Sequence, residues 1–422
     1  MEKAGTARQI NFYYLLAILI NIGLLVFFKY INFFISSIFD LINFTEIKIF
    51  HSSAPATHPD LLNIIAPLGI SYITFQAIGY LIEIKRGNHK AETNLGHFSI
   101  YLFFFSKITA GPIERAHDFL PQLKQPKSFT YENVSSGLKK ILWGLFKKLV
   151  IANRLSLYID AVFPSAREHS GITLFLASIF YVLELYADFS GYTDIALGTA
   201  KVLGYDLMPN FNRPLFSKSV TELWRKWHIS LSSWFADYFY TPITIAKREW
   251  GNWSVAYAFF VTFIVLGFWH GANWTFIIFG ALHAMILTIE FFTKKIRKKI
   301  RKKVPAWLNN IAGIFFTISF FALSLVFFKS DTVSQALLVL KKIFTAKGSL
   351  FILKEEPSTF VYSILGVLCL LILELNPKYY AGDFSLFGKK NWLIQQTVWA
   401  VVIIVILLFG VFDGGQFIYY KF

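Results

Sequence analysis

The chain has 422 residues, of which 55% are hydrophobic and 18% aromatic, and its formal net charge is +16. A water-soluble chain of this length could not reconcile such a composition with a polar surface, so the composition excludes soluble enzymes and binding modules and indicates an integral membrane protein. The single cysteine, Cys369, excludes an internal disulfide bond and a cysteine-based metal cluster.

Apolar segments follow one another along the whole chain. They cover residues 10–39, 61–83, 97–106, 137–163, 171–187, 192–204, 253–269, 274–292, 308–328, 360–375 and 393–412. The first has no small-residue cleavage site and is predicted to be a retained span, not a signal peptide. Since no internal repeat or long linker divides the segments, we predict one all-α polytopic transmembrane domain, residues 1–422, with about 9–11 membrane segments.

Two of these segments, residues 97–106 and 192–204, are too short to cross a bilayer alone, and glycine or proline lies close to both. Irregular backbone at membrane depth is tolerated only where it is buried in protein or lines a wet cavity. We therefore expect re-entrant or broken helices around a central tunnel.

Four polar residues, Asp188, Ser190, Tyr192 and Asp194, interrupt an otherwise apolar stretch. Unpaired carboxylates in such surroundings would be costly. We predict that Asp188 bonds backbone amides or an arginine at a helix break and braces the cavity.

Basic residues concentrate between the apolar segments. Short loops rich in Lys and Arg mark the cytoplasmic side of a membrane protein, so this charge does not indicate a nucleic-acid partner. Two interpretations remain open: a topology signal with attraction to anionic lipid, or a docking surface for an acidic cytosolic donor such as a coenzyme A ester or a carrier protein. The densest block is residues 294–303, with smaller clusters at Lys139-Lys140, Lys147-Lys148, Lys247-Arg248 and Lys389-Lys390.

The basic block at residues 294–303 also predicts orientation. If it faces the cytoplasm, the last three apolar segments place residues 416–422 on the outer face. Lys341, Lys342 and Lys347 would then also lie outside, against the usual distribution of charge. Because Leu and Val mix with Lys at helical spacing over residues 333–344, we predict an amphipathic interfacial helix there.

Two histidines lie among aromatic residues. His270 lies in a long apolar run, where an ionisable side chain is costly enough to indicate function. His228 follows Trp224 and Trp227. The alternative is a packing histidine and, around His228, tryptophans that anchor a helix at the membrane interface. No histidine pair has the spacing of a metal site, so no metal is predicted.

Six ordered motifs resemble the membrane-bound O-acyltransferase family, in particular its bacterial branch that acetylates alginate, other exopolysaccharides or peptidoglycan. The likeness runs from about residue 20 onward, although related chains usually carry further apolar segments before residues 28–34. The motifs are residues 67–71 (PLGIS), 109–115 (TAGPIER), 186–194 (YADFSGYTD), 224–232 (WRKWHISLS), 268–274 (FWHGANW) and 417–422 (FIYYKF).

This resemblance implies roles for individual residues. His270 matches the family's invariant histidine and is expected to remove the proton of an acceptor hydroxyl. His228 matches a second polar position, where it would orient the thioester or stabilise the oxyanion. Arg225, expected on the same helical face as His228, would bind a phosphate of the donor's pantetheine arm. Trp224 would line the donor site, and Asn273 would form hydrogen bonds within it.

The implied activity is transfer of an acyl group, expected to be acetyl, from a cytosolic thioester to a hydroxyl at the extracytoplasmic face of a bacterial cytoplasmic membrane. Acetyl-CoA would be a co-substrate and not a bound cofactor, and an extracytoplasmic esterase-like protein would complete transfer to the polysaccharide. One alternative is D-alanyl transfer from a carrier protein toward teichoic acid. Another is a transporter or flippase, against which the lack of an internal repeat counts.

The final motif also resembles a terminal pattern of some of these acyltransferases, in which a tyrosine is thought to carry the acyl group. Tyr419 matches that tyrosine. The alternative is an aromatic anchor at the membrane interface. Both interpretations stand at this point.

Overall fold

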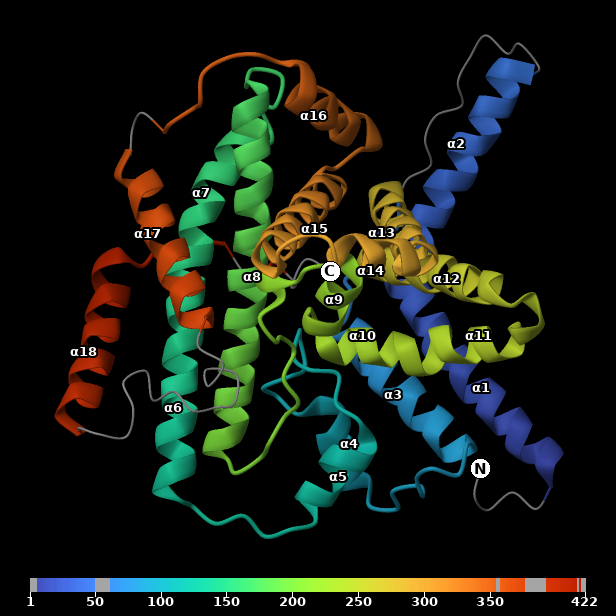
Figure 1. The fold of residues 1–422 in the computed structure, drawn as a ribbon. Coiled ribbons are helices and arrows are strands. Elements are labelled where there is room, and N and C mark those ends of the chain that lie inside the picture. Colours follow the sequence, from blue (N-terminus) through green and yellow to red (C-terminus); the bar gives the residue numbers. More distant parts are fainter. Residues whose placement is uncertain (1–5, 50–60, 354–356, 376–391, 416, 419–422) are drawn as a thin grey trace.

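The computed structural model describes residues 6–49, 61–353, 357–375, 392–415 and 417–418, and this part of the chain is helical without any β-strand. Three π-helical turns lie within it, at Val26–Tyr30, Lys147–Ala152 and Ala236–Tyr240. The α-helices (Figure 1) are α1 (Ala7–Leu25), α2 (Ile31–Ile49), α3 (Ile70–Lys85), α4 (Leu95–Phe103), α5 (Ala116–Leu123), α6 (Tyr131–Phe146), α7 (Asn153–Val162), α8 (Gly171–Val202), α9 (Val220–Lys226), α10 (Ile229–Phe235), α11 (Thr241–Ala246), α12 (Asn252–His270), α13 (Trp274–Phe292), α14 (Lys294–Arg301), α15 (Ala306–Lys329), α16 (Val333–Thr345), α17 (Pro357–Glu374) and α18 (Trp392–Phe409).

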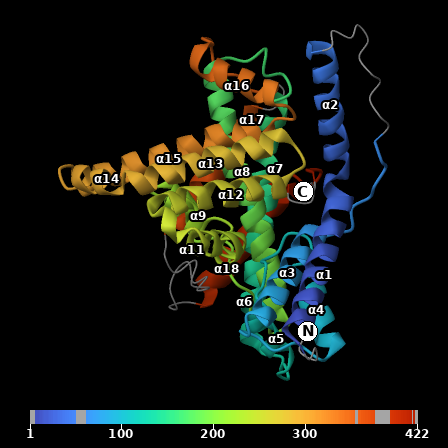
Figure 2. The same cartoon turned by 90° about the vertical axis from the view of Figure 1, so that its right-hand side faces the viewer.

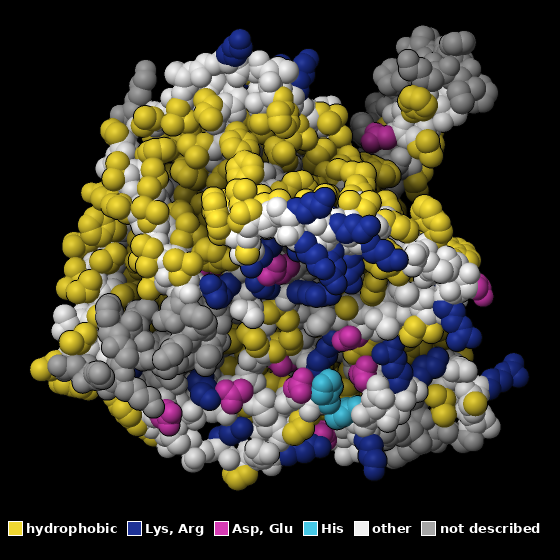
Figure 3. Space-filling model, viewed as in Figure 1, with side chains coloured by type: hydrophobic (Ala, Val, Ile, Leu, Met, Phe, Trp, Pro, Cys, Tyr) yellow, Lys and Arg dark blue, Asp and Glu magenta, His cyan; other side chains and the backbone are white. Residues whose placement is uncertain are grey.

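The predicted all-α polytopic membrane class is confirmed. Within the described residues, seven helices are long and apolar enough to cross a bilayer: residues 7–45, α8, α12, α13, α15, α17 and α18. Many large apolar side chains on these helices are exposed, as lipid-facing positions require. In Figure 3 apolar side chains cover the side formed by α7, α17 and α18, whereas Lys and Arg side chains gather over the basic helix α14.

Helix α8 is the central element, and it corrects the prediction of a break near Asp188. It runs without interruption over Gly171–Val202, through both of the segments that the sequence had suggested were separate. The carboxylates are accommodated by lysines from the adjacent π-helical turn. The prediction that Lys147-Lys148 forms a basic cluster between apolar segments is therefore wrong, since both lysines are buried within the helical protein. Lys148 Nζ donates to Asp188 Oδ1 at 2.7 Å, and Lys147 Nζ donates to Asp194 Oδ2 at 2.7 Å.

Glycines allow α6 and α8 to pack closely enough for these ion pairs. A Cβ atom on Gly144 would lie 2.5 Å from the carbonyl oxygen of Gly191, and one on Gly137 would lie 2.6 Å from that of Gly198. Because the backbones of the two helices are in contact here, the side chains that come directly after α6 can reach α8. The sequence of α6 therefore determines how the charges of α8 are paired.

A second group of helices lies beside α8. Helices α12 and α13 pack against each other, α13 packs on α15, and the short helices α9 and α10 lie beneath them (Figures 1 and 2). The predicted amphipathic helix is α16, whose Ala336 and Val339 are buried where it packs on α8 and α15. Its place at a membrane interface stays a prediction.

Candidate active site

His270 is the last residue of α12. Its side chain is 3% exposed, and its ring lies against Phe328 with centroids 5.2 Å apart. The chain leaves the helix through Gly271, where a Cβ atom would lie 2.1 Å from the ring of Phe276. The glycine after the histidine thus lets the ring of Phe276 pack directly against the chain where it leaves the helix.

His228 lies between α9 and α10 in a left-handed backbone conformation, with φ of 44°. The neighbouring backbone is held by Asn210, whose carbonyl oxygen accepts from the amide of Ile229 at 2.8 Å and whose side chain accepts from the hydroxyl of Ser230 at 2.6 Å. His228 is 1% exposed. A non-glycine residue with positive φ is costly, so the surrounding contacts must hold His228 in this conformation.

Trp269 brings the two histidines into one site. Its indole adjoins the ring of His270 and lies 6.4 Å from that of His228, centroid to centroid. Burial lowers the pKa of His228 well below its ordinary value, and the positive charge that His270 would carry when protonated lowers it further. A neutral imidazole at pH 7 can accept a proton or donate a hydrogen bond, which suits acyl-transfer chemistry.

A π-helical turn, Val26–Tyr30, supports the end of α12 beside His270. Lys29 Nζ donates to the carbonyl oxygen of Trp269 at 2.5 Å, and the hydroxyl of Tyr30 donates to the same oxygen at 3.3 Å. The last carbonyls of an α-helix lack partners within the helix, so these bonds satisfy one of them. Neither residue was predicted from the sequence, although a lysine inside an apolar span was a usable signal.

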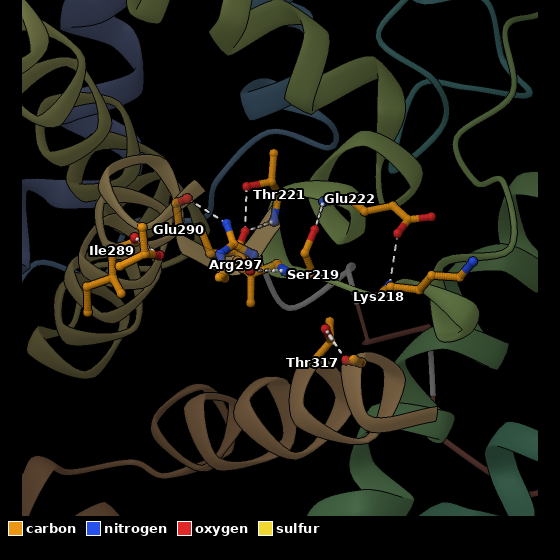
Figure 4. A network of polar contacts seen from close by, with 11 residues as sticks. Lys218, Ser219, Thr221, Glu222, Ile289, Glu290, Arg297 and Thr317 are labelled. Carbon is orange, nitrogen blue, oxygen red and sulfur yellow. Dashed lines mark hydrogen bonds and ion pairs between the residues drawn. The ribbon is translucent and has the colours of Figure 1, made fainter. Parts of the chain in front are cut away.

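Glu290 on α13 fixes the start of α9 (Figure 4). Its carboxylate accepts hydrogen bonds from the amides of Val220 and Thr221 at 3.1 and 2.9 Å and from the Thr221 hydroxyl at 2.5 Å. Arg297 approaches the same carboxylate at 3.7 Å. A carboxylate at a helix N-terminus accepts hydrogen bonds from amides that have no partner within the helix, and its charge interacts favourably with the helix dipole. The sequence did not reveal Glu290, because its partner is 70 residues away in the chain.

Trp224 and Trp227 are buried, so the alternative that they anchor a helix at the membrane interface is wrong. The indole nitrogen of Trp224 donates to Nδ1 of His283 at 3.0 Å, and Nε2 of His283 lies 3.1 Å from the hydroxyl of Ser324. His283 therefore fixes the orientation of Trp224.

Arg225 does not share a helical face with His228. Helix α9 ends at Lys226, and the left-handed residue His228 turns the chain away, so the predicted spacing along one helix is wrong. Arg225 is exposed and, together with Trp224, lines a cavity of about 410 Å³ between α9, α10, α12 and α13. Ser232, Ser233 and Thr262 also line this cavity.

Asn273 caps a helix. Its Oδ1 accepts from the amide of Thr275 at 3.0 Å, and its Nδ2 donates to the carbonyl oxygen of Asp331 at 2.8 Å. Asn is a preferred N-cap residue, and here it starts α13 directly after the turn that follows His270. These contacts place it at the edge of the site as a determinant of backbone geometry.

On α8, polar residues flank Phe189, whose ring contacts that of His228. Ser190 Oγ accepts from Lys147 at 3.1 Å, and the Tyr192 hydroxyl lies 2.5 Å from that of Thr109. Asp188 bonds a backbone amide, that of Ile418, as the sequence suggested, but its basic partner is Lys148 and not an arginine. Tyr419 lies outside the described residues.

The fold and the site together define a class: a polytopic helical membrane protein with two buried histidines at helix ends and a cavity between α9, α10, α12 and α13. The chain belongs to the membrane-bound O-acyltransferase family, whose sequence profile matches residues 88–329 of its 422.

Relatives in this family come from different bacteria. The chain is 36% identical over 276 residues to the "Probable alginate O-acetylase AlgI" of Pseudomonas aeruginosa, covering 65% of this chain and 51% of that protein. It is 32% identical over 377 residues to the peptidoglycan O-acetyltransferase of Helicobacter pylori, covering 82% and 67%. It is 31% identical over 277 residues to the teichoic acid D-alanyltransferase of Bacillus subtilis, covering 64% and 70%. The chain thus spans about half the length of the alginate O-acetylases it matches.

Proposed function

We propose that this chain is an O-acyltransferase that moves an acetyl group from cytosolic acetyl-CoA to a hydroxyl at the outer face of a bacterial cytoplasmic membrane, for O-acetylation of a cell-surface polysaccharide. The observation that carries the proposal is the pair of buried histidines on either side of Trp269. The names of the alginate and peptidoglycan O-acetyltransferase relatives support the choice of acetyl group and acceptor class.

His270 performs the proton transfer in this mechanism. Its neutral imidazole takes the hydroxyl proton as the acceptor oxygen attacks the thioester carbonyl. His228 stabilises the negative charge that develops on that carbonyl oxygen. When the carbon–sulfur bond breaks, the imidazolium of His270 returns the proton to the leaving thiolate, so an ester and a free thiol form without net change in protons.

The donor enters through the cavity beside α9. Arg225 at its opening is suited to bind a donor phosphate, because guanidinium pairs with phosphate through two hydrogen bonds. Trp224 forms the wall against which the pantetheine arm would lie. A partner protein outside the membrane would carry the acyl group on to the polysaccharide, with Tyr419 as the first acyl acceptor.

D-Alanyl transfer is the second candidate, and the similarity to the teichoic acid D-alanyltransferase of Bacillus subtilis favours it. The reaction at the two histidines would be the same, with a D-alanyl thioester on a carrier protein as the donor. The donor that the purified protein accepts decides between the two.

The experiment is thioester cleavage by purified protein in detergent, where there is no membrane to cross. Free coenzyme A should be released from acetyl-CoA when a hydroxyl acceptor is supplied. Replacement His270→Ala should reduce release by about 100-fold or more, the usual scale for general base catalysis. The matched control is His117→Ala, since His117 is exposed on α5.

Two results would overturn the proposal. Full activity in folded His270→Ala protein would exclude this residue as the base. Thioester cleavage at background with every donor and acceptor, together with substrate uptake by sealed vesicles, would establish a transporter instead.

A further inference from the structure

Residues 409–414 are fastened to α7 and to the π-helical turn before it. Arg154 donates to the carbonyl oxygen of Phe409 at 2.7 Å, and Asn153 donates to that of Val411 at 2.7 Å. The amide of Val411 donates to the carbonyl oxygen of Leu149 at 2.9 Å. The chain after α18 is thereby led along the protein surface toward α8.

Phe417 and Ile418 reach the polar residues of α8. The amide of Ile418 donates to Asp188 Oδ2 at 2.8 Å. The ring of Phe417 lies 4.7 Å from Lys148 Nζ and 5.2 Å, centroid to centroid, from the ring of Tyr192. One backbone donor and one aromatic side chain are thus held by the same small group of residues.

Asp188 divides its two oxygens between two partners. Oδ1 accepts from Lys148 and Oδ2 accepts from Ile418, while the side chain is 1% exposed. If its only role were to neutralise Lys148, the second oxygen would not need to face the backbone of a segment 230 residues away. A buried carboxylate that accepts a backbone N–H forms one of the stronger hydrogen bonds in proteins.

We propose that Asp188, paired with Lys148, is a positioning residue that holds residues 417–418 against α8. The next residue of α8, Phe189, touches His228 with ring centroids 4.6 Å apart. Residues 417–418 are therefore bound by Asp188, whose neighbour on α8, Phe189, contacts the candidate active site. This inference rests on the proposed function for its purpose, which is to present Tyr419 for acylation.

The test is amide hydrogen exchange of the full-length protein in lipid nanodiscs. Replacement Asp188→Asn removes the charge and should speed exchange over residues 411–418 by about 10- to 100-fold, the scale expected for a hydrogen bond to a charged group. Exchange in α12 and α13 should stay as in the wild type. The control is Asp160→Asn, which breaks the exposed ion pair with Lys329 and should leave residues 411–418 protected.

A second variant avoids any disturbance of α8. Ile418→Pro removes the donor N–H itself and should release the segment to the same extent. The double variant of Asp188→Asn and Ile418→Pro should then show no further release, because both changes remove one interaction. Unchanged exchange over residues 411–418 in both single variants would overturn the proposal.

Measurements of acyl transfer distinguish a positioning role of Asp188 from a general structural role. If Asp188 acts through the C-terminal segment, Asp188→Asn should lower formation of an acyl adduct on Tyr419 by the same factor as it lowers transfer, and should add nothing in a Tyr419→Phe background. An additive loss in that background would overturn the positioning role. If Tyr419→Phe alone transfers normally, the relay in the proposed function fails, while the exchange experiment still decides whether Asp188 holds the segment.

Discussion

The ring of Phe189 on α8 stands edge-on to the imidazole of His228, with centroids 4.6 Å apart and ring planes at 87°. Edge-to-face contacts of this kind orient a ring as well as burying it. A helix of 32 residues therefore contributes directly to the placement of a side chain that lies between two much shorter helices. Changes in α8 are expected to reach the site through this contact.

The backbone conformation at His228 should make a glycine variant more stable than an alanine variant, the reverse of the usual order within helices. Because φ is 44° there, glycine fits without strain, whereas alanine retains the Cβ penalty of about 1 kcal/mol. We expect His228→Gly to unfold at a higher temperature than His228→Ala, although both lose acyl transfer equally because both lack the imidazole. Thermal unfolding in detergent measures the order, and a more stable alanine variant would contradict the conformational argument.

Glu290 is expected to matter for transfer as well as for stability. Glu290→Gln removes the charge at the N-terminus of α9 and should cost about 1–2 kcal/mol of stability. Because α9 carries Trp224 and Arg225, the apparent KM for the donor should rise more than the rate constant falls. The control is Glu249→Gln at an exposed position. A variant with wild-type KM would show that the network serves stability alone.

The contact between α12 and α13 gives a matched pair of glycine substitutions. A Cβ on Gly280 would lie 2.1 Å from the carbonyl oxygen of Phe263, so Gly280→Ala should separate the two helices and lower both the unfolding temperature and transfer by His270. Gly23 on α1 has open space around it, so Gly23→Ala should be neutral or stabilising by up to about 1 kcal/mol. Equal effects of the two substitutions would exclude close packing as the reason for Gly280.

Stability should depend on pH through His228. Its folded-state pKa is lowered from 6.5, so the unfolded chain binds more protons and stability falls as pH drops below about 6.5. The loss approaches about 1.4 kcal/mol per pH unit for one such group. His228→Gln should flatten the dependence of unfolding temperature on pH between pH 7.5 and pH 5. Ser230→Ala, which removes a neighbouring buried hydroxyl, should shift the curve without flattening it. An unchanged slope in His228→Gln would refute the assignment.

The membrane class and its helices could be predicted from hydropathy, since a long apolar run has few structures open to it in a bilayer. Burial of His270 followed in the same way from its apolar surroundings. The break at Asp188 was predicted wrongly, because a carboxylate in an apolar run looks unpaired until Lys148 is placed beside it. Such pairing depends on how α6 packs on α8, which no local pattern contains.

The prediction that Arg225 and His228 share a helical face was wrong for a different reason. Spacing of three residues predicts a common face only if the helix continues, and the left-handed conformation at His228 ends it. The roles of Glu290, Lys29 and His283 also depend on partners distant in sequence. Sequence reasoning identified the residues that differ most from their surroundings, but not the residues that hold them.

The ion pairs between the π-helical turn after α6 and helix α8 have a consequence for how the protein is made. Lys147 and Lys148 emerge from the ribosome before Asp188 and Asp194, and burying any one of these charges without its partner would be costly. Paired, the four charges cancel. The turn after α6 is therefore expected to pack into the protein only once α8 has been synthesised, and the two elements are expected to assemble in one step.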